Sequence, residues 1–235
     1  MTETVLGIPG LWDTREKLLG ALMAAHGARF MLTGHTLLDT HGGGAVQVQE
    51  GGFIAALEKS FRVVGVYSDF TEGDFSAIRT HKQCLFLVDT DGGSLEAAAR
   101  MVRMGQALLQ AGGFAVKVES SGKAHSERDW LDLNAGDPED LFWAYVMLAG
   151  SPGRWSSCGM HNLGLADITL TGVSDSQTAA TLVDTLARYL LLDQPDIKEG
   201  ESFGLGPDEP AYRLKKVPCT EFPEGDAYHN PHGLW

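Results

Sequence analysis

The sequence contains little cysteine and no long hydrophobic run. Its three cysteines, Cys84, Cys158 and Cys219, lie far apart and form no CxxC pair. This spacing excludes a disulfide scaffold and predicts reduced thiols, as in a cytoplasmic protein. The longest apolar runs, residues 85–88 and 190–192, are much shorter than the ~20 residues of a membrane-spanning helix. Because residues 1–17 also lack the basic start and apolar core of a secretory signal, we expect a cytoplasmic protein.

Basic residues are scarce relative to acidic ones. The chain has 18 Lys and Arg against 31 Asp and Glu, which gives a formal net charge of −13 at pH 7. A field of this sign repels phosphate backbones and anionic lipid surfaces. The charge therefore argues against nucleic-acid and membrane partners and favours a basic protein partner. Nothing in the sequence indicates an oligomeric state.

The overall composition is that of a folded globular protein. With 43% hydrophobic and 21% charged residues, 235 residues are enough for one sizeable core. No long polar linker interrupts the chain, so we expect a single compact domain over residues 1–235. Two halves, 1–125 and 126–217, are possible within it, followed by a C-terminal coil over 218–235.

The clearest local signals lie between residues 84 and 118. The apolar run at 84–88 predicts a buried strand, and Ser94 predicts the start of a helix that reaches about residue 111. Residues 114–118 predict a second strand after Gly112-Gly113. A strand, a helix and a strand in this order predict a right-handed βαβ unit whose two strands run parallel and side by side.

Other segments show weaker helix and strand signals. Helices are predicted over 14–26 with Asp13 as the cap, from Asp137-Pro138 to about residue 149, and over 174–192 from a Ser174 and Gln177 capping box. Residues 155–171 predict a strand with a bulge at Gly164, and the alternation at 45–49 predicts a half-buried strand. The mixture predicts an α+β fold with a mixed sheet and packed helices, and two ferredoxin-like halves would explain the two long capped helices.

The sharpest chemical motif is Asp89-Thr-Asp91-Gly at the end of the first central strand. It resembles the first motif of the haloacid-dehalogenase phosphatase superfamily. The resemblance implies that Asp89 attacks phosphorus, that Asp91 acts as acid and base, and that Mg²⁺ lies between them. Ser120 or Ser121 would then hold the phosphate and Lys123 would be the cationic clamp.

The same motif also fits a plain structural role. About 80 residues precede it, and position 93 is Gly where the superfamily usually has Thr. The Asp137 and Asp140 pair, which would supply the further acidic motif, also reads as a helix cap. The alternative interpretation is an Asp-Gly turn that solvates the junction between a strand and a helix.

A second candidate site follows the second central strand. Ser120, Ser121, Lys123 and His125 lie within six residues of one another. Because ligands bind at the carboxyl ends of parallel strands, these side chains are predicted to share a rim with Asp89 and Asp91. An unspecialised loop is the alternative, and the Gly122-Lys123 pair does not complete a phosphate-binding loop.

A third candidate is the segment Cys158-Gly-Met-His161-Asn162. It offers a thiol, an imidazole and an amide for binding, but no paired spacing for a metal, and we predict no metal site. In a straight strand Cys158 and His161 would lie on opposite faces, so a buried thiol and a hydrogen-bonded imidazole are the alternative. The aromatic residues Phe222, Tyr228 and Trp235 predict that the C-terminal coil docks onto the domain rather than onto a partner.

Five segments together resemble a bacterial family of uncharacterised proteins that carry a C-terminal domain of unknown function. These segments are residues 7–12, 112–118, 121–124, 157–164 and 230–235. The resemblance implies a bacterial cytoplasmic protein and no assigned activity or catalytic residues. It therefore leaves the function open.

Three functions fit these observations. The first is a non-catalytic binding or immunity-type protein with a basic partner and no cofactor. The second is a Mg²⁺-dependent phosphohydrolase that uses Asp89 and Asp91, and the third is a small-molecule sensor at the rim around Ser121, Lys123 and His125. The acidic composition and the incomplete catalytic set favour the first.

Overall fold

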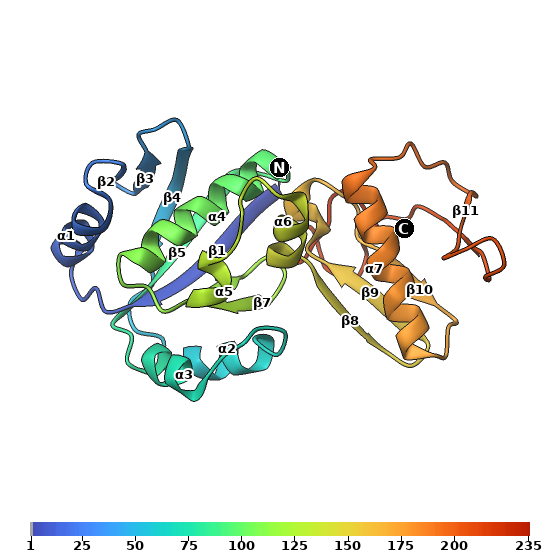
Figure 1. The fold of residues 1–235 in the computed structure, drawn as a ribbon, viewed down its shortest axis with the longest axis horizontal. Coiled ribbons are helices and arrows are strands. Elements are labelled where there is room, and N and C mark those ends of the chain that lie inside the picture. Colours follow the sequence, from blue (N-terminus) through green and yellow to red (C-terminus); the bar gives the residue numbers. More distant parts are fainter. Residues whose placement is uncertain (1) are drawn as a thin grey trace.

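The computed structural model describes residues 2–235 and is built around a seven-stranded sheet (Figure 1). The strand order is β2-β3-β4-β5-β1-β6-β7, and every neighbouring pair in it is antiparallel. The strands are β1 (Thr2–Gly10), β2 (Phe30–Thr33), β3 (Thr36–Asp39), β4 (Gly44–Glu50), β5 (Gln83–Gly92), β6 (Ala115–Val118) and β7 (Lys123–Ser126).

The N-terminal strand β1 occupies a central position in this sheet. It pairs antiparallel with β5 on one side and with β6 on the other, so β5 and β6 point in the same direction. The predicted parallel orientation of these two strands is therefore correct, but the prediction that they lie side by side is wrong. The physical reason is β1, whose Leu6 and Ile8 are fully buried between the neighbouring strands and helix α4 (Leu95–Gln110).

Helices cover both faces of the sheet. Helix α4 and helix α1 (Arg15–His26) pack against each other on one face, and α2 (Leu57–Val64) and α3 (Glu72–Arg79) lie on the opposite face (Figure 1). The side chains of β5 alternate accordingly. Leu85 and Leu87 belong to the core under α4, whereas Cys84 packs with Phe61 and Ile78 of α2 and α3.

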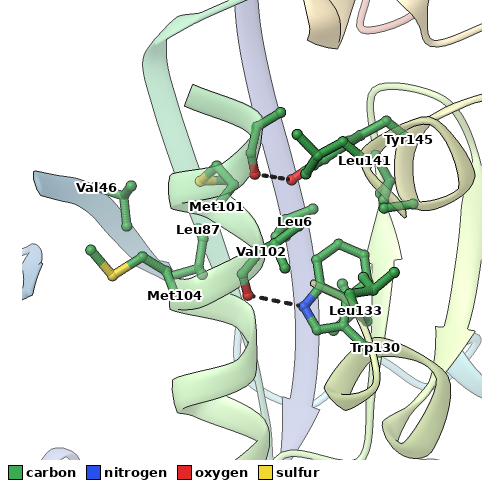
Figure 2. Close-up of a cluster of buried hydrophobic side chains, with 14 of the residues drawn as sticks. Leu6, Val46, Leu87, Met101, Val102, Met104, Trp130, Leu133, Leu141 and Tyr145 are labelled. Carbon is green, nitrogen blue, oxygen red and sulfur yellow. Dashed lines mark hydrogen bonds between the residues drawn. The ribbon is translucent and has the colours of Figure 1, made fainter. Parts of the chain in front are cut away.

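In the main core, two aromatic side chains from other helices donate hydrogen bonds to backbone carbonyls of α4 (Figure 2). Trp130 of α5 (Glu127–Leu131) donates from Nε1 to the Val102 carbonyl at 3.2 Å. Tyr145 of α6 (Pro138–Tyr145) donates from its hydroxyl to the Ala98 carbonyl at 3.0 Å. Gly105 is required here, because a Cβ at this position would lie 2.6 Å from Trp130 Nε1. These contacts fix α5 and α6 against the central helix.

A second, three-stranded sheet follows α6 in the sequence. Its order is β10-β9-β8, with β8 (Met147–Ser151), β9 (Arg154–Cys158) and β10 (Thr169–Thr171), and α7 (Ser176–Leu192) packs on it. A short 3₁₀ helix, η1 (Met160–Leu163), contacts α4, α6 and β1, and so links this sheet to the first. The short strands β11 (Ser202–Phe203) and β12 (Tyr212–Arg213) form a separate pair. The predicted α+β class is confirmed.

Several predicted boundaries are confirmed and others are wrong. Ser94 caps α4, and Asp137 caps α6 with Pro138 at its first turn, as predicted. However, α6 ends at Tyr145, and the next residues form β8 rather than more helix. Residues 155–171 are two strands separated by η1, because Gly159 adopts a φ of 111° that ends β9. The caps of α1 and α7 are Thr14 and Asp175, one residue later than predicted.

The C-terminal coil docks onto the second sheet, as its aromatic residues predict. The Trp235 N–H donates to the Asp167 carbonyl at 2.8 Å, and the Thr169 N–H donates to the Trp235 carbonyl at 2.7 Å. The rings of Phe222 and Tyr228 lie 5.4 Å apart within the coil. Among residues 2–235, no helix has both the length and the apolar character that crossing a membrane requires.

Candidate functional site

Asp89 lies at the end of β5 and is held by an internal ion pair. It is only 4% exposed, and its Oδ2 accepts hydrogen bonds from Arg100 Nε at 2.9 Å and from Arg100 Nη2 at 2.6 Å. Its Oδ1 accepts the backbone N–H of Asp91 at 3.1 Å. Both carboxylate oxygens therefore have partners within the chain, whereas Asp91 is exposed. The predicted Asp-Gly turn is wrong, because residues 89–92 belong to β5 and pair with β1 across a register shift between Thr2 and Thr4. Arg100 holds one carboxylate oxygen of Asp89 through two N–H groups.

Ser120 and Asn162 meet beside Thr4 of β1, which pairs with Asp89 of β5. Asn162 Oδ1 accepts hydrogen bonds from Ser120 Oγ at 2.7 Å and from Thr4 Oγ1 at 2.9 Å. Asn162 Nδ2 donates to the Gly159 carbonyl at 3.0 Å. All three side chains are buried, so each needs these partners to avoid the cost of an unsatisfied polar group. The cluster joins β1, the loop after β6, and η1.

Asp167 organises the polar groups on the other side of η1. Its Oδ1 accepts hydrogen bonds from Ser157 Oγ at 2.9 Å and from the Met160 N–H at 3.2 Å. Its Oδ2 accepts a hydrogen bond from Asn230 Nδ2 at 2.6 Å. This buried carboxylate is thus solvated by the protein itself and connects the second sheet to the C-terminal coil.

His161 precedes Asn162 and lies near Asp167, and its ring makes no hydrogen bond among the described residues. The residue is 1% exposed, and neither ring nitrogen has a hydrogen-bond partner among residues 2–235. Its Nδ1 is 3.9 Å from Asp167 Oδ2, which is too far for a hydrogen bond. A buried imidazole without a partner carries an energetic penalty, so this residue is unusual in a protein interior.

A polar cavity of about 320 Å³ opens beside His161. We call it the acidic cavity. Its chemically distinctive lining residues are Glu3, Ser120, His161, Glu224, Asp226 and His229. They come from β1, from the loop after β6, from η1 and from the C-terminal coil. The volume is at the lower end of the range typical of ligand pockets.

Ser121 and Cys158 line a different cavity, of about 520 Å³, next to the β8–β9 hairpin. Ser121 is fully buried and its hydroxyl has no partner among the described residues. Cys219 lines the same cavity from the C-terminal coil. Burial and the nearby Asp167 raise the pKa of the Cys158 thiol to about 12, so it is a poor nucleophile at neutral pH.

Lys123 is buried at the start of β7, beside the end of α6. Its ammonium donates to the carbonyls of Trp143 and Val146, and it lies 4.8 Å from the centroid of the Trp143 ring. Burial, together with the charge of Arg188, lowers the pKa of Lys123 to about 7. The lysine satisfies carbonyl groups at the end of a helix that would otherwise lack partners, which is a structural role.

His125 is fully buried on β7 and packs between aromatic rings. Its ring centroid lies 4.5 Å from that of Trp143 and 5.2 Å from that of Trp130. Its Nε2 is 2.8 Å from the Ala144 carbonyl, so the ring is held as a neutral Nε2–H donor. Burial and the charge of Lys123 lower the pKa of His125 to about 3.

The predicted site residues therefore fall into separate surroundings. Ser120, His161 and Asn162 come together beside the acidic cavity, whereas Ser121 and Cys158 line the hairpin cavity. Lys123 lines a third cavity, and His125 lies inside the core. The predicted opposite orientation of Cys158 and His161 assumed a straight strand, and that assumption is wrong because β9 ends at Cys158.

Sequence reasoning missed the acidic side chains that line the acidic cavity. Glu3, Glu224 and Asp226 lie at the two ends of the chain, more than 200 residues apart in sequence, and no local motif connects them. Asp167 was missed for the same reason, since its partners Ser157 and Asn230 lie on separate segments. The described residues contain no group of three or more His, Cys, Asp or Glu side chains that could hold a metal ion.

Comparisons with models of protein families, with curated proteins and with solved structures gave no match to this chain.

Proposed function

We propose that this chain is a non-catalytic binding protein that engages a basic protein partner, as an immunity-type protein does when it neutralises a toxin. The observation that carries the proposal is the distribution of charge. The net charge is −13, and many of the chain's cations are paired with its own carboxylates. The remaining surface is therefore dominated by acidic side chains.

Arginine side chains on several helices form salt bridges with carboxylates of the same chain. Arg62 of α2 pairs with Glu58 and Glu72, and Arg188 of α7 pairs with Glu139 and Asp184. Arg100 is partly buried against Asp89. These guanidinium groups are not free to form a basic surface for an anionic ligand, which favours a cationic partner.

In the segment after α7, carboxylates far outnumber basic side chains. Residues 193–209, which we call the acidic segment, carry six exposed carboxylates and one lysine. The carboxylates are those of Asp193, Asp196, Glu199, Glu201, Asp208 and Glu209. Lys198 pairs with Asp196 inside the segment. Such a concentration of charge attracts a basic protein over roughly one Debye length, about 8–10 Å at moderate salt.

A capture experiment tests the proposal. The tagged chain is exposed to protein extract from the cells that encode it, at about 50 mM and about 500 mM NaCl. We expect it to retain a basic protein at the lower salt and to lose it at the higher salt. The retained protein, once purified, should form a stable complex with the chain and lose its own activity in that complex.

Charge variants locate the interaction. A variant with Glu199→Gln, Glu201→Gln, Asp208→Asn and Glu209→Gln should lose the partner. A matched control with Glu16→Gln, Glu96→Gln, Glu127→Gln and Asp132→Asn removes the same charge from other exposed positions and should keep it. Absence of any basic partner at low salt, or retention that ignores both salt and charge, would contradict the proposal.

The phosphohydrolase hypothesis has its own test. It needs an Asp89 carboxylate that can leave Arg100 and attack phosphorus, whereas Arg100 binds Asp89 through two hydrogen bonds. Turnover of a panel of phosphate esters with Mg²⁺, compared between the wild type and Asp89→Asn, measures it directly. Activity that disappears in Asp89→Asn while the fold is retained would favour the enzyme over the binding protein.

A further inference from the structure

A histidine of the C-terminal coil lies at the junction where the end of the coil meets the second sheet. This residue, His232, follows Asn230 by two positions and lies near Asp167 and His161. We propose that His232 is a pH-sensitive switch, which keeps the end of the coil docked while its ring is neutral and releases it in mild acid. The inference concerns contacts within the chain, so it stands apart from the proposed basic partner.

The contacts that dock the end of the coil gather around one residue, Asp167. Its Oδ2 accepts the side-chain amide of Asn230 at 2.6 Å, its N–H donates to the Gly233 carbonyl at 3.2 Å, and its carbonyl accepts the Trp235 N–H at 2.8 Å. The Thr169 N–H donates to the Trp235 carbonyl at 2.7 Å. A new charge at this junction therefore acts where the coil is attached.

The junction offers no acceptor for the second N–H of a charged imidazole. Nε2 of His232 and both ring nitrogens of His161 are shielded from solvent and make no hydrogen bond among residues 2–235. The carboxylate oxygens of Asp167 already accept three hydrogen bonds from other groups. An imidazolium has two N–H donors, and placing it in a buried site without acceptors is costly.

The charged groups that surround His232 come from three parts of the chain. They are His161 of η1, Lys216 before the coil, and Asp167 before β10. Burial lowers the pKa of His232, the charges of His161 and Lys216 lower it further, and the attraction of Asp167 opposes them only in part. In the released coil the ring is hydrated, and its pKa returns to about 6.5.

The sign of the pH dependence follows from this difference. Above about pH 6.5 the ring is neutral whether the coil is docked or released, so docking is independent of this group. Below this pH the released coil binds a proton that the docked coil excludes. Docking therefore weakens as the pH falls, by up to about tenfold for each pH unit.

Release of the coil also opens the hairpin cavity. The coil contributes Cys219, Phe222 and Tyr228 to the lining of this cavity, whereas Cys158 lines it from β9. When the coil leaves, that wall is lost and Cys158 becomes accessible to solvent. Mild acid thus converts a covered cavity into an open surface of the second sheet.

Amide hydrogen exchange, followed by NMR between pH 5 and pH 7.5, tests the switch. The amides of Asp167, Thr169 and Trp235 report docking, because each donates across the junction. Their protection, relative to the intrinsic exchange rate at each pH, should fall about fivefold or more from pH 7 to pH 5. The amides of Leu6 and Leu87, which lie in paired central strands, should change less.

Three variants separate loss of the titration from weaker docking. In His232→Gln, which takes up no proton, the protection of Trp235 should stay nearly constant between pH 7 and pH 5. The exposed control His35→Gln should show the wild-type fall. Glu221→Gln removes the coil carboxylate that pairs with Arg154, so it should lower the protection at every pH and keep the fall in acid.

Equal protection of the junction amides at pH 7 and pH 5 in the wild type would overturn the switch. So would a fall that persists in His232→Gln, or an equal loss at Leu6 and Leu87, which would mean that acid opens the whole fold. If the coil of His232→Gln is already undocked at pH 7, Lys216→Gln decides the matter. It removes a cation that opposes the proton, so the fall should move to lower pH, and an unmoved fall contradicts the proposal.

Discussion

Asn230 donates a 2.6 Å hydrogen bond to the buried carboxylate of Asp167 and so attaches the C-terminal coil to the second sheet. The same amide donates to the Leu165 carbonyl at 3.0 Å. The coil carries Glu224 and Asp226, so this one contact both stabilises the fold and positions the acidic cavity.

Asn230→Ala should lower the free energy of unfolding by about 2–4 kcal/mol, because it leaves a buried carboxylate with fewer partners. Urea unfolding followed by circular dichroism measures the change. Thr220→Ala, an exposed position in the same coil, should change it by less than about 0.5 kcal/mol. Equal effects of the two substitutions would show that the Asp167 contact contributes nothing particular.

Lys123 should make stability depend on pH in the alkaline range. Its pKa is lowered by burial to about 7 in the folded chain, against about 10.4 when it is exposed. Unfolding therefore takes up a proton between these values, and stability should rise with pH from 7 to about 10.4 by up to ~1.4 kcal/mol per unit. The variant Lys123→Met should lose this rise, and the exposed control Lys215→Met should keep it. Identical pH profiles for all three proteins would contradict the assignment.

His125 should make the free energy of unfolding depend on pH in the acidic range, because its pKa also differs between the folded and the unfolded chain. Burial lowers its pKa to about 3, whereas the exposed value is about 6.5. The unfolded chain binds the proton first, so stability should fall as the pH drops below about 6.5. In His125→Gln, which keeps a side-chain donor, the fall should be shallower than in the wild type and in the exposed control His35→Gln. Unfolding free energies measured at several pH values between 4 and 7 decide the question, and an unchanged slope in His125→Gln counts against it.

Cys84 should be inert in the folded protein. It is fully buried, and burial together with the charge of Glu119 raises the pKa of its thiol to about 12. At pH 8 only about one thiol in ten thousand would be ionised, so iodoacetamide should label it about a thousandfold more slowly than in urea. Mass spectrometry of the labelled chain identifies the site. Fast labelling of Cys84 without denaturant would mean that α2 and α3 leave the sheet readily.

The elements that the sequence predicted well are those defined by local signals. Ser94 predicted the start of α4, and the apolar run before Asp89 predicted β5, because capping and hydrophobic pattern act over a few residues. Strand β1 was missed, since Gly7, Pro9 and Gly10 are poor strand formers and its central place depends on pairing with distant β5 and β6. Tertiary pairing overrides local preference there.

The candidate site was predicted in part for a related reason. Ser120, His161 and Asn162 were recognised as chemically capable residues, and they do come together. Their partners Thr4, Asp167 and Asn230 come from segments far apart in the chain, and no spacing in the sequence brings them to one place. The ion pair between Asp89 of β5 and Arg100 of α4 could not be predicted from the motif alone. Because Arg100 occupies one carboxylate oxygen of Asp89, the Asp-x-Asp motif has a structural role in this fold.

The association rate of the captured partner, measured on the immobilised chain over a range of NaCl concentrations, tests the central claim most directly. Electrostatic steering predicts that the rate falls about tenfold or more between low and high salt, while the dissociation rate changes much less. The acidic-segment variant should show a slow rate with little dependence on salt. An association rate for the wild type that is the same at all salt concentrations would contradict the account.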